Sequence, residues 1–315
     1  MKKSFLKSLP VLMLIAGASF AFTACSKDAK KPTDETEHKD HEDPQKAVLT
    51  LVEGHLHGTY KFHQNPNWKG VIKNPQTITF TNTKEGWKPA EGSLRKFNVR
   101  SGASVYGLWI RYYNKAGKDI TGEFVSNGQD KIHQHFFIPK NIEKTFDGTD
   151  EEGDENIAEL FDYTYCDTDP WDKSMKKDDA RLVGDKNPVG LKGYFKFKKT
   201  RKQFELNIRL MHAAESKFDK DGKTSPFHSP SDAQLQSDHW DLTMKIPVVI
   251  YCSRGEFVMD LDKKIAMPEK DIPENEMKYL KSIAKAYDIT WQEALKDLKA
   301  KYDDSSSEES GELWF

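Results

Sequence analysis

The stretch VLTLVEGHLHGTYKF, residues 48–62, alternates between apolar and polar side chains along most of its length. Successive side chains of a β-strand point to opposite faces, so Glu53, His55 and His57 would share one face. Val52 and Leu56 would share the other. Alternation of this kind is typical of a half-buried strand. The stretch therefore predicts a β-strand with one apolar face and one face that carries histidines.

The same period of two recurs along the chain in segments rich in aromatic and β-branched residues. These segments are 76–82, 104–113, 132–138, 191–198, 203–212 and 239–251. Clusters of Gly, Asn, Asp and Pro between them favour turns, and no strand segment is followed at once by a helical pattern. We therefore predict a mainly β fold, an antiparallel β-sandwich or barrel.

The β part is expected to begin at residue 47. Residues 47–144 would form a first β-domain, and residues 145–267 either a second β-domain or a continuation of the first. The two-domain alternative rests on a weak internal repeat, in which LWIRYYNKAGKD and then HQHFFIP resemble LNIRLMHAAESK and then HWDLTMKIP. Similarity by chance between strands of one type explains the repeat equally well.

The C-terminal part changes to helical spacing of its apolar residues. Residues 268–303 are expected to form a helical hairpin, and Thr290 with Glu293 has the form of a capping box at the start of its second helix. Residues 304–315 are expected to form an acidic tail that is flexible up to its last three residues, Leu313-Trp314-Phe315, which would dock on the domain or on another protein.

The N-terminus predicts export to the cell envelope. A basic start precedes an apolar run from Leu9 to Phe22, which is too short to cross a bilayer, and residues 1–25 therefore read as a signal peptide. Phe22-Thr23-Ala24-Cys25 resembles the lipobox of bacterial lipoproteins. This resemblance implies that Cys25 is acylated and that the protein is lipid-anchored, on the periplasmic side or the surface of the outer membrane.

Residues 26–46 are nearly all charged, small or Pro, so they cannot bury enough apolar surface to offset the entropy of ordering. We interpret them as a disordered charged tether, in which His38 and His41 are solvated or, as the alternative, capture metal loosely. The formal net charge of −2 argues against nucleic-acid binding, which needs a basic face. Cys166 and Cys252 form either one disulfide or two unpaired buried thiols.

Two His-x-His pairs are the strongest candidates for a functional site. His55 and His57 project from one predicted strand, and His133 and His135 from another. If these strands pair or face each other, four imidazoles converge around one metal ion. Glu53 would be a further ligand or would orient an imidazole. Nitrogen ligands suit zinc, copper, nickel or iron and disfavour calcium and magnesium. The alternative is that each pair lies on a polar sheet face and never meets the other.

His212 has a different environment, because it shares a strand face with apolar residues. It is either a hydrogen-bonded core histidine or an axial ligand in an apolar haem pocket. In the haem interpretation, His239 or His63 would be its partner. These three histidines are therefore additional candidate ligands.

The chain as a whole resembles outer-membrane lipoproteins that accompany TonB-dependent receptors in Bacteroidota. The resemblance lies in the predicted lipoprotein signal peptide, the charged tether and the β-rich part with paired histidines. This resemblance implies capture of a transition metal or haem and its transfer to an outer-membrane TonB-dependent receptor. On this interpretation His55, His57, His133 and His135 bind the metal, and Cys25 carries the lipid.

Two other classes stay open. His-x-His on a strand is also similar to the metal strand of cupins and copper/zinc superoxide dismutases. Thr59, Tyr60 and Lys61 stand where the cupin pattern expects Glu, and only His63 is available as the bridging histidine of a dismutase, so an enzyme is less favoured. Glu53, His55 and His57 would still permit iron oxygenase chemistry. A glycan-binding lipoprotein would instead use exposed tryptophans as stacking platforms: Trp68, Trp87, Trp109, Trp171 and Trp240.

Overall fold

The structure, a computed structural model, describes residues 39–102, 104–144, 157–177, 179–251, 261–304 and 311–315. The expected signal peptide, Cys25 with its expected acylation, most of the expected tether and Cys252 lie outside the described residues. The side chains of a few further residues, such as Tyr302, are also outside this description.

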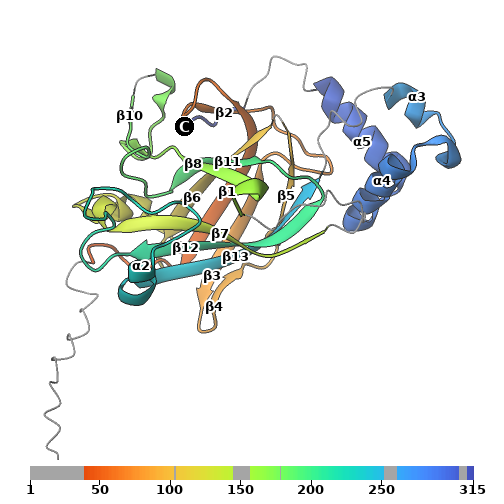
Figure 1. Cartoon of the computed structure of the whole chain (residues 1–315). Coiled ribbons are helices and arrows are strands. Elements are labelled where there is room, and N and C mark those ends of the chain that lie inside the picture. Colours follow the sequence, from red (N-terminus) through yellow and green to blue (C-terminus); the bar gives the residue numbers. More distant parts are fainter. Residues whose placement is uncertain (1–38, 103, 145–156, 178, 252–260, 305–310) are drawn as a thin grey trace, which may run out of the picture. The chain divides into compact units, whose positions relative to one another are not determined.

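The larger of two main sheets has seven strands, and all of its pairs are antiparallel (Figure 1). Six of them follow the order β4-β3-β1-β6-β11-β8, and β2 pairs with the end of β1. Their bounds are β1 Lys46–Leu56, β2 Phe62–Gln64, β3 Gln76–Thr83, β4 Gly86–Pro89, β6 Val105–Tyr113, β8 Phe161–Tyr165 and β11 Lys192–Phe197.

The second sheet has the order β5-β13-β12-β7. Its strands are β5 Phe97–Arg100, β7 His133–Lys144, β12 Lys202–His212 and β13 His239–Tyr251. The pair β5–β13 is parallel, and the other pairs are antiparallel. The short strands β9 Thr168–Asp169 and β10 Arg181–Leu182 form a separate two-stranded sheet.

One hydrophobic core joins the inner faces of both sheets. It includes Leu49 and Ile110 from the seven-stranded sheet, and Phe137, Ile208 and Ile246 from the four-stranded sheet, all of them fully buried. Alternating residues of each strand enter this core, as the period of two requires. The mainly β, antiparallel prediction is therefore confirmed. The expected single strand of residues 48–62 is divided into β1 and the start of β2, and the sequence missed the short strands β4, β5, β8, β9 and β10.

The two copies of the weak sequence repeat have different topologies. β12 and β13 are neighbours in one sheet, whereas β6 and β7 belong to different sheets. The repeated Ile-Arg and Ile-Pro sequences therefore occur in strands with different partners.

The helical elements are short apart from α4 and α5. They are η1 Thr121–Phe124, η2 Gln129–Lys131, α1 Ile157–Leu160, η3 Met175–Lys177, α2 Asp232–Ser237, α3 Leu261–Ile265, η5 Glu269–Asp271, α4 Glu274–Tyr287 and α5 Trp291–Asp304. Thr290 and Glu293 form the expected capping box, because each side chain accepts the other residue's backbone N–H. Leu280 and Leu295 of this hairpin share an apolar cluster with Val249 of β13. Within the described part of the chain, every helix is too short or too polar to span a bilayer.

Candidate metal centres

A buried group of three histidines and one aspartate lies at one end of the four-stranded sheet. His133 is the first residue of β7 and His212 is the last residue of β12, and the two are directly opposite each other in the antiparallel register. Both continue the core-facing side of their strands, after Phe137 and Ile208 respectively. The strand pairing alone therefore brings two imidazoles together inside the protein.

A β-bulge adds Asp241 to this pair. The register of β12 and β13 passes from Leu210 opposite Leu242 to Met211 opposite Trp240, which leaves Asp241 without a partner opposite. Regular alternation would place Asp241 on the other face from the core residue Leu242. The bulge turns the strand locally and aims the carboxylate inward, as bulges next to functional sites commonly do.

His41 completes the group from the segment before β1. Its side chain is fully buried, and its ring lies 4.3 Å from the ring of Phe124 and 4.9 Å from that of His133, between ring centroids. The expectation that His41 is a solvated tether residue is therefore wrong. The charged residues around it hid the fact that one imidazole of this segment packs inside the fold.

The ligand atoms of these four residues have the spacing of a coordination shell. The distances to Asp241 Oδ2 are 3.3 Å from His133 Nε2, 3.6 Å from His212 Nδ1 and 3.7 Å from His41 Nε2. All four ligand atoms lie within 4.8 Å of one another. Metal–ligand bonds of about 2.0–2.1 Å at tetrahedral angles separate neighbouring ligand atoms by roughly 3.3 Å. The group needs only small movements to hold an ion.

Hydrogen bonds on the far side of two rings fix which nitrogen faces the centre as an acceptor. His133 Nδ1–H donates to the carbonyl of Gln129 at 2.9 Å, and His41 Nδ1–H donates to the carbonyl of Glu42 at 3.1 Å. In the neutral rings each Nε2 therefore carries a lone pair directed at a carboxylate. Among the described residues, these two Nε2 atoms and Asp241 Oδ2 are buried without a hydrogen-bond partner. Such an arrangement of acceptors is costly unless a cation lies between them.

The local pKa values favour the protonation states that metal ligands require. Burial lowers the pKa of His41 to about 4 and also lowers the pKa of His133. Burial by itself raises the pKa of Asp241, but the neighbouring His133 and His212 outweigh it and hold that pKa below its usual range. At neutral pH the rings of His41 and His133 are therefore neutral, and the carboxylate of Asp241 is ionised.

His135 does not join the group, although it points to the same side of β7 as His133. Its Nδ1–H donates to the carbonyl of Val189 at 2.7 Å, and the hydroxyl of Tyr112 donates to its Nε2 at 2.6 Å. Both ring nitrogens are thus used, and burial lowers the pKa of His135 to about 4. The sequence expectation that His135 is a metal ligand is therefore replaced by the role of a hydrogen-bonded core histidine.

The other His-x-His pair forms a second group at the protein surface. β1 and β2 make a hairpin in which His55 is directly opposite His63, and His57 lies in the turn. His57 Nε2 is 3.1 Å from His55 Nε2 and 3.3 Å from His63 Nδ1. We call His41, His133, His212 and Asp241 the buried site, and His55, His57 and His63 the exposed site.

The single site of four histidines expected from the sequence is thus divided into two. β1 lies in the seven-stranded sheet and β7 at the edge of the other, so the two His-x-His pairs do not meet. Glu53 belongs to neither site, because it is buried and accepts a hydrogen bond from Ser104 Oγ at 2.9 Å. His239 lies beside the buried site, with its Nε2 3.8 Å from Asp241 Oδ1.

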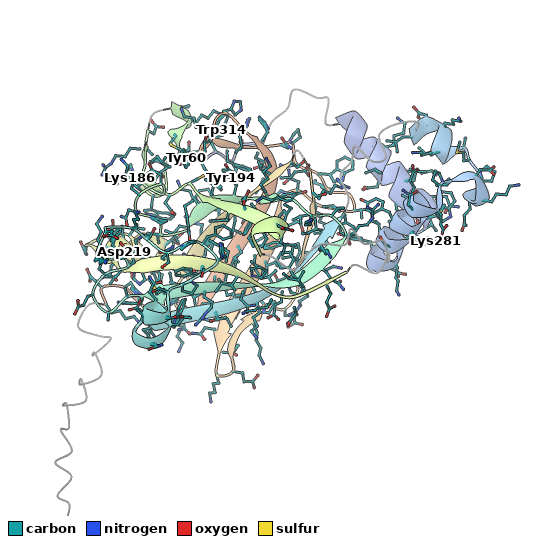
Figure 2. The ribbon with its side chains drawn as sticks, in the orientation of Figure 1. Tyr60, Lys186, Tyr194, Asp219, Lys281 and Trp314 are labelled. Carbon is teal, nitrogen blue, oxygen red and sulfur yellow. The ribbon has the colours of Figure 1, made fainter. Side chains whose placement is uncertain are left out.

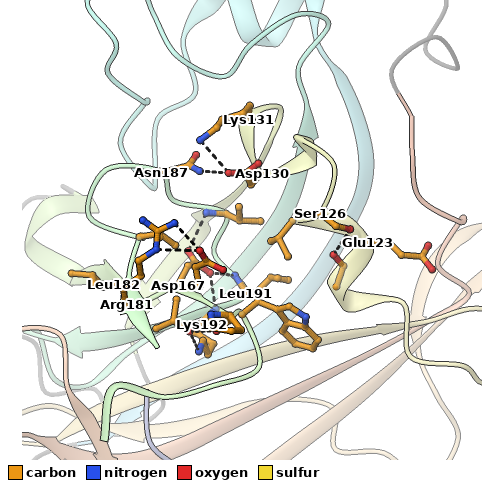
Figure 3. Close-up of a pocket in the computed structure, with 18 of the residues that line it drawn as sticks. Glu123, Ser126, Asp130, Lys131, Asp167, Arg181, Leu182, Asn187, Leu191 and Lys192 are labelled. Atoms are coloured by element: carbon orange, nitrogen blue, oxygen red, sulfur yellow. Dashed lines mark hydrogen bonds and ion pairs between the residues drawn. The ribbon is translucent and has the colours of Figure 1, made fainter. Parts of the chain in front are cut away.

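A polar pocket with a volume of about 840 Å³ is a separate feature (Figure 3). Asp167 accepts hydrogen bonds there from four successive backbone N–H groups, those of Val189, Gly190, Leu191 and Lys192. The neighbouring Cys166 is buried and has no disulfide partner among the described residues, which do not include Cys252. Four of the five tryptophans considered for stacking are partly buried against apolar clusters: Trp87, Trp109, Trp171 and Trp240.

No protein-family model, no curated protein and no solved structure matches this chain. The class of the protein is therefore defined by its fold and its sites, as a mainly β protein with one buried and one exposed group of candidate metal ligands.

Proposed function

We propose that this protein is an envelope-anchored lipoprotein that binds one transition-metal ion in the buried site and transfers it to an outer-membrane uptake system. The observation that carries the proposal is the convergence of three imidazole nitrogens on Asp241 Oδ2 at 3.3–3.7 Å. The buried lone pairs of His41 and His133, which have no partner among the described residues, support a cation at this point.

The donor set favours zinc, with copper and iron as the alternatives. Three imidazoles and one carboxylate match the nitrogen and oxygen ligands of these metals and do not suit calcium or magnesium, which prefer oxygen alone. Four protein ligands complete a tetrahedral shell. Because a closed shell leaves no position for substrate, the buried site suits storage or transfer better than catalysis.

A haem ligand role for His212 has less support from its surroundings. His41, His133 and Asp241 fill the space next to its ring, with ring centroids 5.7 Å and 4.6 Å from those of the two histidines. This polar enclosure suits a single ion better than a porphyrin, whose pocket has apolar walls.

The lipobox-like sequence at Cys25 supports anchoring at the outer membrane, and the charged segment after it supports a tether to the β body. In this arrangement a TonB-dependent receptor is the expected recipient of the metal. A receptor that accepts the metal should increase the rate at which the metal-loaded protein releases its ion.

The proposal is tested by the metal content of the full-length chain, purified in detergent. The protein is equilibrated with equimolar zinc, copper, nickel and ferrous iron, desalted, and analysed by mass spectrometry. We expect His212→Ala to lose one ion per chain relative to the wild type. His228→Ala is the matched control, because His228 is a partly exposed histidine outside both sites. Equal metal content in the wild type and in folded His212→Ala, verified by circular dichroism, would overturn the proposal.

A further inference from the structure

The exposed site is built on a hairpin whose geometry is fixed by packing. His57 N–H donates to the carbonyl of Lys61 at 2.8 Å and closes the turn. The ring of Phe62 lies against Gly107 of β6, where a Cβ atom would be only 2.6 Å from the ring. Glycine at this position therefore allows β2 to fold closely over the sheet, which holds His63 opposite His55.

The outer nitrogens of two rings are held by hydrogen bonds. His55 Nδ1–H donates to Asn65 Oδ1 at 2.8 Å, and His63 Nε2–H donates to the carbonyl of Gly311 at 3.1 Å. In the neutral rings His55 Nε2 and His63 Nδ1 are therefore both acceptors, and both face His57 Nε2. The single proton of a neutral His57 satisfies one of them at most. A metal ion satisfies all three nitrogens, and the outer hydrogen bonds orient the ligands for it.

Residues 311–315 form one wall of the exposed site. Leu313 accepts a backbone hydrogen bond from Gln64 at 2.9 Å, and Phe315 donates one to Phe62 at 3.1 Å, so this segment pairs with β2. The indole of Trp314 stacks on the ring of His63, with centroids 3.9 Å apart and an angle of 18° between the planes. Trp314 lies at the same end of the β body as Tyr60 and Tyr194 (Figure 2).

We propose that His55, His57 and His63 form a second transition-metal site, which has three protein ligands and a fourth position open to solvent. His55 and His57 are exposed, and the ring-to-ring contacts of 3.1 Å and 3.3 Å between nitrogens match the spacing of ligands around one ion. The site stands on its own residues and does not depend on the buried site. Its open position accepts a water molecule or a ligand from a metal donor, which makes it the site for exchange with solvent.

The test uses cobalt(II) chloride as the probe and Trp314 as the reporter. Bound paramagnetic cobalt quenches a stacked indole, and the contribution of Trp314 is obtained by subtracting the fluorescence of Trp314→Phe from that of the wild type. The full-length chain is titrated in detergent, and bound cobalt is counted by equilibrium dialysis.

We expect His57→Ala to abolish the quenching of Trp314 and to remove one equivalent of bound cobalt. His57 is exposed and lies in the turn, so this variant should fold as the wild type does, and His57→Gln provides a second variant of similar size. His212→Ala should retain the quenching, because it affects the buried site alone. Absence of quenching in the wild type, or its persistence in folded His57→Ala and His57→Gln, overturns the inference. A loss of cobalt in His212→Ala without any change in quenching separates the two sites.

Discussion

His133 Nε2 lies 3.3 Å from Asp241 Oδ2 inside the protein, and neither atom has a hydrogen-bond partner among the described residues. The far nitrogen of His133 already donates to Gln129, so the neutral ring presents a lone pair to a carboxylate. Two acceptors in contact destabilise the metal-free fold and attract a cation. Metal affinity and stability of the metal-free protein should therefore respond in opposite directions when one acceptor is removed.

Asp241→Asn tests this coupling. The amide keeps the size of the side chain, removes its charge and can donate to His133 Nε2. We expect metal affinity to fall by roughly 100-fold or more, because even partners of metal ligands contribute about 10–100-fold. The metal-free variant should gain about 1 kcal/mol in free energy of unfolding, the typical contribution of one hydrogen bond. Competition with a chelating dye and urea unfolding in EDTA measure the two effects.

Asp238→Asn is the control for this change. Asp238 Oδ1 accepts a hydrogen bond from the backbone of Ala214 at 3.2 Å, and Asn retains such an oxygen. This variant should bind metal as the wild type does. If Asp241→Asn also keeps the wild-type affinity, the carboxylate is not a ligand.

His133→Ala and His135→Ala should differ, although the two residues share one His-x-His pair. His133→Ala removes a ligand, so one metal ion per chain should be lost. His135→Ala leaves the Val189 carbonyl and the Tyr112 hydroxyl without their partner and opens a cavity, which should lower the free energy of unfolding by about 2–4 kcal/mol. Its metal content should not change. The metal content and the urea unfolding of both variants test this difference. Loss of metal only in His135→Ala would contradict the assignment of His133 as a ligand and His135 as a core histidine.

Most strands were predictable from their alternation. In β1, however, the side that carries Glu53 and His55 also carries the core residues Leu49 and Leu51, so the expectation of a polar histidine face was wrong there.

The candidate metal sites were harder to predict from the sequence, and particular residues show why. Regular alternation along β13 would place Asp241 on the face of the sheet that Leu242 does not occupy, away from the core. Only the bulge, which depends on the pairing of β13 with β12, turns Asp241 inward. His41 lies in a segment whose composition indicates solvation, and its burial depends on Phe124 and His212 from distant parts of the chain.

The positions of the other site histidines depend on which strands pair with one another, and the sequence does not show this pairing. Sequence spacing correctly indicates that His55 and His57 lie close together, but it does not indicate that β1 and β7 belong to different sheets. His63 joins His55 through the short hairpin strand β2, which has only three residues and therefore no period of its own. His212 was recognisable as a core-facing histidine from its apolar neighbours, and its role as a ligand depends on Asp241.

Lys192 should make the stability of the protein depend on pH in the alkaline range. Burial lowers the pKa of Lys192 to about 8, against an ordinary value near 10.5. Between these pH values the unfolded chain binds a proton that the folded protein does not bind. The free energy of unfolding should therefore rise with pH from about 8 to 10.5, by up to roughly 3 kcal/mol for this residue.

Urea unfolding of the wild type and Lys192→Met across this range isolates the effect of Lys192 as a difference. Lys196→Met is the matched control, since Lys196 lies on the same strand with its side chain exposed. A constant difference between the wild type and Lys192→Met from pH 8 to 10.5 would contradict the prediction.

Cys166 should be unreactive in the folded protein. Its side chain is fully buried, and burial raises the pKa of the thiol, whereas the thiolate is the reactive form. We expect no alkylation of Cys166 by iodoacetamide at pH 8 in buffer and complete alkylation in urea, measured by mass spectrometry of its peptide. Rapid modification of the folded protein at this residue would show that the cluster around Cys166 opens readily.

Phe315 should hold Trp314 in place over the exposed site. Its ring is fully buried against Phe62 and Trp109, with centroids at 5.0 Å and 6.4 Å. Truncating a buried Phe costs about 3–5 kcal/mol, but this segment can open locally before the rest unfolds. Phe315→Ala should therefore release Trp314 to solvent, with a smaller loss of global stability. Acrylamide quenching of the Trp314 contribution should increase, and cobalt should enter the exposed site faster.

Glu312→Ala, at an exposed position of the same segment, is the control. An unchanged accessibility of Trp314 in Phe315→Ala would mean that the backbone pairing with β2 alone retains it.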